Sequence, residues 1–176
     1  AFIPSYMEEK AIGRLEGKKF ADEVLNLLII ILLGVIFLVE IFTPVVIYLI
    51  APGFYDNLEK FNLAVELARI TFPFLFFVSL SSFFSGILNS NNKFAAAAAA
   101  PIVLNIFLIS SLFISYFFNL NFELNLSYAV PLAGLFQLIF LIFFTKYYYK
   151  PAINFKININ SKIKFFLRKL LPSIFS

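Results

Sequence analysis

Long apolar stretches separated by short polar segments dominate the chain. Four of them, at residues 24–50, 70–88, 95–118 and 128–149, are long enough to cross a hydrocarbon core about 30 Å thick as helices. Shorter apolar pieces at residues 1–6 and 172–176 are expected to end one further helix and begin another. The pattern predicts an all-α, polytopic membrane bundle with four complete transmembrane helices and partial helices at both ends, as in a fragment of a longer membrane protein.

The polar connectors alternate in their content of Lys and Arg. Residues 7–23, 89–94 and 150–171 carry most of the Lys and Arg, whereas residues 51–69 and 119–127 carry mainly acidic side chains. Positively charged loops of membrane proteins remain in the cytoplasm. The first three connectors are therefore predicted to be cytoplasmic, and the other two periplasmic.

Several connectors have an internal pattern. Residues 7–23 mix both charge signs with two Gly, which indicates a solvated loop with a short helical turn. The Pro-Gly pair in residues 51–56 predicts a turn, followed by an interfacial amphipathic helix that reaches residue 69. Strict alternation in residues 153–160 favours an extended segment, and residues 161–171 have the pattern of a basic amphipathic helix on a membrane surface.

Composition supports a membrane protein and excludes several kinds of chemistry. Hydrophobic residues make up 61% and charged residues 14% of the chain, against about 50% and 25% in soluble domains. Cys and His are absent, so disulfides, thiolate nucleophiles and the usual zinc sites are not expected, and we predict no metal and no cofactor. The net charge of +4 lies in short loops rather than in a stripe, which argues against a nucleic-acid partner.

Proline and small polar residues mark where the spans bend and pack. Pro44, Pro73 and Pro101 are predicted helix kinks, because proline removes a backbone donor that neighbouring groups must replace. Ser and Gly are frequent in residues 79–86, and small residues let membrane helices approach closely. The hairpin formed by the second and third spans should therefore pack against other helices.

Five polar residues are candidates for substrate contact or gating. Glu40 is an ionisable residue within a span, so it either faces a cavity or lies near the interface and reaches water. Arg69 is either an interfacial anchor or a group in a polar cleft. Gln137 either bonds to another helix, for about 1 kcal/mol, or lines a substrate route. Asn105 lies within the third span and Lys93 in the hairpin turn. No residue is predicted to be catalytic.

Five short motifs lie in order along nearly the whole chain: AFIP at residues 1–4, APGF at 51–54, RITFPFLFFVSL at 69–80, GILN at 86–89 and KFAAAAAAPIVLN at 93–105. Together, and in this register, they resemble the motifs of the MurJ/MviN family of lipid II flippases. The chain departs from the family pattern at Ala97, where the family often has Pro, and Glu40 is not a residue that this pattern leads one to expect.

The resemblance implies a multi-pass transporter of the bacterial inner membrane, in the multidrug/oligosaccharidyl-lipid/polysaccharide exporter superfamily. The chain would form the later part of the N-terminal lobe. The implied mechanism is alternating access, and the implied substrate is lipid II or a similar sugar linked to a polyprenyl pyrophosphate. Further partners would be membrane lipids and the remainder of the same chain. The arginines that bind the headgroup in this family lie mainly outside the matching region, so that role is not transferred to Arg69.

Other functions remain open at the level of sequence. A related exporter could move another lipid-linked oligosaccharide or a drug, and a non-transporting scaffold could bind a partner through the Ser-rich face of the hairpin. An integral membrane enzyme is disfavoured, because clustered carboxylates, His and a nucleophile with its base are missing from the pattern.

Overall fold

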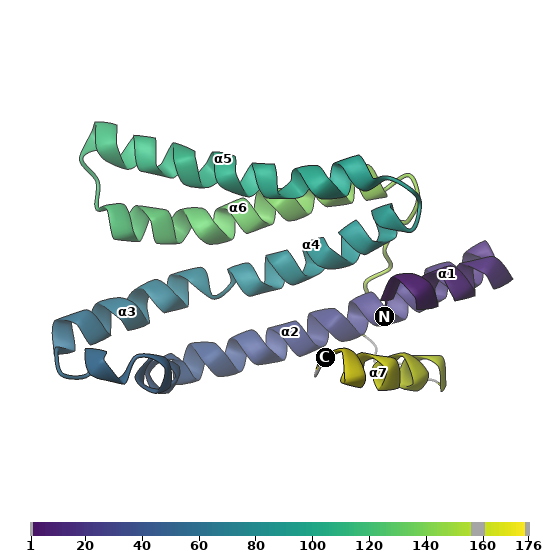
Figure 1. The fold of residues 1–176 in the computed structure, drawn as a ribbon, viewed down its shortest axis with the longest axis horizontal. Coiled ribbons are helices and arrows are strands. Elements are labelled where there is room, and N and C mark those ends of the chain that lie inside the picture. The colour runs from purple at the N-terminus through teal and green to yellow at the C-terminus, as the bar shows by residue number, and fades with distance from the viewer. Residues whose placement is uncertain (1, 156–160, 175–176) are drawn as a thin grey trace.

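The computed structural model describes residues 2–155 and 161–174, and every regular element within them is a helix (Figure 1). In chain order the elements are α1 (Phe2–Ile12), α2 (Arg14–Ile50), the short 3-10 helix η1 (Pro52–Phe54), α3 (Leu58–Thr71), α4 (Phe74–Asn89), α5 (Phe94–Phe118), α6 (Phe122–Thr145) and α7 (Ser161–Ile174).

Four helical stretches have the length and apolar composition needed to cross a membrane. They are Arg14–Ile50, Leu58–Asn89, Phe94–Phe118 and Phe122–Thr145. The first three contain the whole of the spans predicted at residues 24–50, 70–88 and 95–118, and the fourth contains most of the span predicted at residues 128–149. The all-helical fold with four membrane-length helices is therefore confirmed.

The loop predicted at residues 7–23 is wrong, because this segment is helical. α1 continues to Ile12, and α2 begins one residue after Gly13. Gly17, Phe20, Ala21 and Val24 are all buried, and their spacing places them on one face of a helix. The charged residues between them obscured this short apolar face in the sequence.

Other element boundaries differ by a few residues. α6 begins at Phe122 rather than near residue 128, because the Asn121 side chain accepts a hydrogen bond from the backbone N–H of Leu124 at 2.9 Å and caps the helix. α7 continues to Ile174, so residues 172–174 extend the amphipathic helix instead of starting another. Residues 156–160 of the predicted extended segment lie outside the described residues, and residues 151–155 form no helix.

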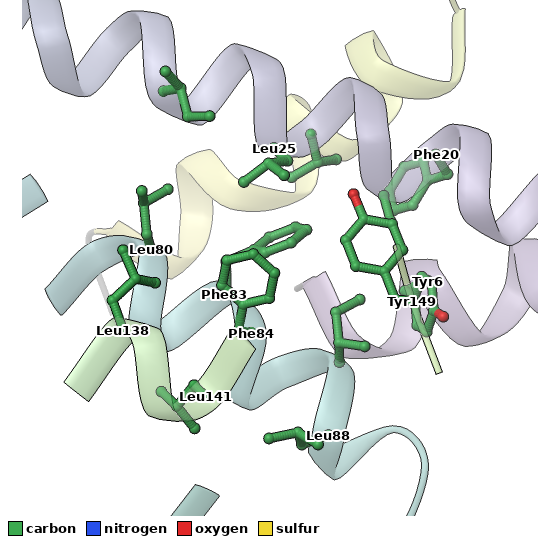
Figure 2. Close-up of a cluster of buried hydrophobic side chains, with 14 of the residues drawn as sticks. Tyr6, Phe20, Leu25, Leu80, Phe83, Phe84, Leu88, Leu138, Leu141 and Tyr149 are labelled. Carbon is green, nitrogen blue, oxygen red and sulfur yellow. The ribbon is translucent and has the colours of Figure 1, made fainter. Parts of the chain in front are cut away.

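The helices form a stack in which α6 lies between α5 and the α3–α4 pair, with α2 on the other side of that pair (Figure 1). Their shared core is concentrated near the end of the bundle that contains α1. Figure 2 shows Leu25, Phe83, Phe84 and Leu141 meeting there, and each is at most 6% exposed. Large apolar side chains remain exposed along α2 and α5, as expected for surfaces that face lipid or further helices.

The three predicted kink prolines have different surroundings. Pro44 and Pro101 lie inside α2 and α5, whereas Pro73 lies between the end of α3 and the start of α4. Pro44 cannot donate to the carbonyl of Glu40, and the Thr43 hydroxyl donates to that oxygen at 3.2 Å instead. The polar group freed by Pro44 is thus satisfied within the helix.

α7 packs against α2 through apolar contacts and forms ionic contacts with both α1 and α2. Phe166 is buried and its ring meets the ring of Phe20 edge-on, with centroids 5.6 Å apart. The Lys162 ammonium donates to Glu9 at 2.6 Å and lies 3.7 Å from Glu16. The hydrogen bond with Glu9 raises the pKa of Lys162 above its ordinary value, so the contact favours the ammonium form of Lys162.

Candidate functional site

Three segments that are distant in sequence meet at one end of the bundle: the α1–α2 junction, the α4–α5 turn (residues 90–93) and the residues that follow α6 (Figure 1). They enclose a cavity of about 670 Å³, which we call the basic cleft. Its lining residues are Tyr6, Lys10, Arg14, Leu15, Lys18, Asn91, Lys146, Tyr147, Tyr148, Tyr149 and Lys150. The first two segments lie in connectors that the charge pattern predicts to be cytoplasmic, and the third lies at the start of the predicted cytoplasmic connector that begins at residue 150.

Every charged residue that lines the basic cleft is a cation. Lys18 is partly neutralised by Asp22, whose carboxylate lies 2.7 Å from the Lys18 ammonium. Within residues 2–155 and 161–174, no ion pair involves the other four, Lys10, Arg14, Lys146 and Lys150. The basic cleft therefore holds a concentrated positive charge that its own lining does not balance.

Apart from Asp22, three acidic residues of α1 and α2 lie on a different face. Glu9, Glu16 and Glu23 line a small cavity next to α7, together with Lys19 and Lys162. Lys10, Arg14 and Lys18 instead recur every fourth residue. The α1–α2 segment thus separates its charges, with the acidic side facing α7 and the basic side facing the cleft.

Close packing and one hydrogen bond hold Lys10 at the cleft. A Cβ atom at Gly17 would lie 3.0 Å from the Cα atom of Lys10, so glycine is what allows α1 to approach α2 this closely. The Lys10 ammonium donates to Asn91 Oδ1 at 2.6 Å, and the Asn91 amide donates to the backbone oxygen of Ile87 at 2.7 Å. The α1 helix is in this way tied to the α4–α5 turn.

The opposite wall is held by polar side chains of α2. The buried Tyr149 hydroxyl donates to Asp22 Oδ1 at 2.7 Å, and the backbone N–H of Ala152 donates to the same oxygen at 2.9 Å. Asn26, which is 2% exposed, bonds to three backbone groups of residues 152–155. These contacts fix the chain that leaves α6 against α2.

Two aromatic rings lie close to Lys146 at the end of α6. The Lys146 ammonium lies 4.0 Å from the centre of the Phe143 ring and 5.2 Å from that of Tyr147. Ammonium groups over aromatic faces are attracted to them without being neutralised. Tyrosines are also enriched where the apolar core of a membrane meets water. The residues after α6 thus combine features of a membrane interface with available positive charge.

None of the five sequence-predicted site residues lines the basic cleft. Lys93 is closest to it by location, since it lines a neighbouring cavity and its ammonium lies 6.0 Å from the Tyr148 ring centre. Arg69 and Asn105 are exposed on α3 and α5, and Gln137 is buried on α6. Glu40 has one buried carboxylate oxygen without a hydrogen-bond partner among the described residues. The structure does not bring these five together in one site.

Sequence reasoning missed the basic cleft, although two signals pointed to it. Lys10, Arg14 and Lys18 have the spacing of a single helix face, and the three basic connectors were expected on one side of the membrane. Over the described ranges, no three His, Cys, Asp or Glu side chains are grouped as a metal site would need. The arrangement is suited to binding anions rather than to metal chemistry.

The membrane-length helices and the charged connectors gathered at one end define the chain as part of a multi-pass helical membrane protein. The family model described as Lipid II flippase MurJ matches residues 1–176. The chain therefore belongs to the MurJ lipid II flippase family, whose members are transporters of the bacterial inner membrane rather than enzymes.

Curated relatives support this assignment. The chain is 42% identical over 157 residues to a probable lipid II flippase MurJ from Rickettsia prowazekii (strain Madrid E), which covers 89% of the chain and 30% of the relative. It is 41% identical over 143 residues to the protein of the same description from Rhizobium tropici, and this alignment covers 78% of the chain and 27% of the relative. A third, from Buchnera aphidicola subsp. Acyrthosiphon pisum (strain APS), is 38% identical over 179 residues, and this alignment covers 99% of the chain and 34% of the relative. The chain thus spans about a third of the length of these relatives.

Proposed function

We propose that the protein containing this chain moves lipid II across the inner membrane by alternating access, with this chain forming the later part of its N-terminal lobe. The observation that carries the proposal is the family match over residues 1–176. Substantial identity to three proteins described as probable lipid II flippases supports it. The substrate is lipid II or a similar sugar linked to a polyprenyl pyrophosphate.

The role proposed for these helices is to form a scaffold and to take part in gating. Helix breaks and polar turns are the places where a helical bundle can change shape, and here they lie at Pro73 and at the α4–α5 turn. Lys93 in that turn remains a gating candidate. Arg69, Asn105, Gln137 and Glu40 remain candidates for substrate contact, on four different helices.

Complementation tests the proposed activity. The full-length gene that contains this chain is expected to restore growth when the resident lipid II flippase of a bacterium is depleted. Colony counts after depletion provide the measurement, and the same gene without its region for residues 58–118 is the negative control. An intact, membrane-inserted full-length protein that leaves the cells unable to grow would contradict lipid II transport and favour a related exporter or a scaffold.

Cysteine labelling tests the proposed orientation. The described chain has no Cys, so single cysteines can be placed at Lys93 and Glu123 of an otherwise cysteine-free full-length protein. Because basic connectors are retained in the cytoplasm, a membrane-impermeant maleimide should label the Glu123 position in intact spheroplasts and the Lys93 position only after lysis. The reverse labelling pattern would overturn the proposed orientation.

A further inference from the structure

We propose that the basic cleft binds the phosphate of a lipid headgroup. The ligand class is an amphiphile with a phosphate on its polar end and an apolar chain attached to it. This inference does not depend on which lipid the complete protein transports, because it follows from the geometry of the cleft and of the cavity beside it.

The charge of the cleft favours an anion. Four of its five cations, Lys10, Arg14, Lys146 and Lys150, have no ion-pair partner within the described part of the chain. Holding several cations around one cavity costs electrostatic energy, which a bound anion offsets. Arg14 also supplies the planar, forked set of donors that matches phosphate oxygens.

The size of the cleft suits a headgroup. Its volume is about 670 Å³, which lies within the range of about 300–1,000 Å³ found for small-molecule sites. Asn91 and four tyrosines stand among the cations. The hydroxyls of Tyr147 and Tyr148 offer uncharged hydrogen-bonding groups to the part of a headgroup that surrounds its phosphate. The cleft is therefore large enough for a headgroup and larger than a single small inorganic ion needs.

A second cavity explains why the ligand should be a lipid. It measures about 590 Å³, and most of its wall is apolar, with Leu88, Phe94, Ala95, Ala96 and Phe144 among its lining residues. It shares Tyr147 and Tyr148 with the basic cleft, so the two cavities adjoin. A phosphate site that continues into an apolar site fits an amphiphile, with the charged end among the cations and the chain along α5 and α6.

The location agrees with this chemistry. The cleft lies just beyond Thr145, the last residue of an apolar membrane-length helix, and next to three consecutive tyrosines. Basic pockets between helices at the cytoplasmic membrane surface are typical sites for anionic lipid headgroups. The phosphate can come from an acidic membrane phospholipid or from a polyprenyl diphosphate, and the experiment separates these two sources.

Native mass spectrometry of the detergent-purified, full-length protein tests the proposal. The probes are phosphatidylglycerol, phosphatidylcholine, a polyprenyl diphosphate and inorganic phosphate, each titrated separately and then in competition. We expect phosphatidylglycerol or the polyprenyl diphosphate to bind at least tenfold more tightly than phosphatidylcholine. The lipid that retains its occupancy when both are present at equal concentration identifies the source of the phosphate.

Charge variants locate the binding. A variant with Arg14→Gln and Lys150→Gln is expected to bind the anionic lipid about 25-fold more weakly, because each basic residue near a membrane surface contributes about fivefold in affinity. The matched control replaces Lys19 and Lys164 with Gln, since both are exposed and neither lines the cleft. A second variant, with Arg14→Lys and Lys150→Arg, keeps the charge and should bind within about fourfold of the unaltered protein.

The apolar cavity has its own variant. Ala95→Leu fills part of this cavity and should weaken binding of the lipid without changing binding of inorganic phosphate. Equal lipid binding by the unaltered protein and the Arg14→Gln, Lys150→Gln variant would overturn the proposal. An equal loss in the Lys19→Gln, Lys164→Gln control would also overturn it, because the attraction would then be general. Melting temperatures measured on the same samples confirm that each variant is folded.

Discussion

An Asn26→Leu variant is expected to lose about 2–4 kcal/mol of stability and to release residues 152–155 from α2. The Asn26 amide donates to the backbone oxygens of Asp22 and Ala152 at 2.7 and 2.9 Å. Its oxygen accepts from the N–H groups of Asn154 and Phe155 at 2.9 and 3.1 Å. Each buried backbone group that loses its partner costs about 1–3 kcal/mol, and water recovers part of this loss where the segment reaches the surface.

Hydrogen exchange and thermal unfolding measure this effect on the full-length protein in detergent. The amides of Asn154 and Phe155 should exchange at least tenfold faster in the variant, since their acceptor is gone. Asn62→Leu is the matched control, because Asn62 is exposed on α3. If exchange at residues 152–155 were equally fast in the control and in Asn26→Leu, the segment would not depend on Asn26.

Replacing Gly134 with alanine is expected to destabilise the contact between α6 and α4 by about 1–3 kcal/mol. A Cβ atom at Gly134 would lie 2.6 Å from Cδ2 of the Phe74 ring and 3.1 Å from the Cβ atom of Phe77. The Phe74 ring would have to shift, and the Phe77 Cβ atom moves only with its backbone. Overpacking of this kind forces side chains from their preferred rotamers and shifts the helix axes.

The melting temperature of the detergent-solubilised, full-length protein reports this change, and Gly134→Leu should lower it further. Gly34→Ala provides the control, because no atom lies within 4 Å of a Cβ placed at Gly34. The control should leave stability unchanged or raise it by up to about 1 kcal/mol, since alanine favours helix more than glycine does. Equal melting temperatures for Gly134→Ala and the unaltered protein would show that α4 and α6 are not closely packed there.

The number and kind of the long helices could be predicted from the sequence because hydrophobic length alone determines them. Residues 24–50 and 95–118 are predominantly apolar, so these two spans can be recognised by their length without any helical periodicity. The segment before Val24 needed periodicity and was interpreted wrongly. Its apolar face is only a few residues wide, and the buried Phe20 and Ala21 stand among charged neighbours.

The candidate site was less predictable because it depends on contacts between distant residues. Spacing alone places Lys10, Arg14 and Lys18 on one helix face, but it does not show that Asn91 lies beside them. The pairing of Asp22 with Tyr149 joins residues 127 positions apart. The hydrophobicity pattern carries no information on such pairs. It draws attention to polar residues inside the spans, whereas the basic cleft lies at the end of the bundle.

The attachment of residues 149–155 to α2 has a mechanical consequence. Tyr149, Ala152 and Asn154 are hydrogen-bonded to Asp22 and Asn26 of α2, and α7 contacts α2 through Phe166 and α1 through Lys162. Residues 149–155 and α7 are therefore both held in place by contacts with the α1–α2 segment. A displacement of α7 would therefore act first on the part of α2 that contains Phe20.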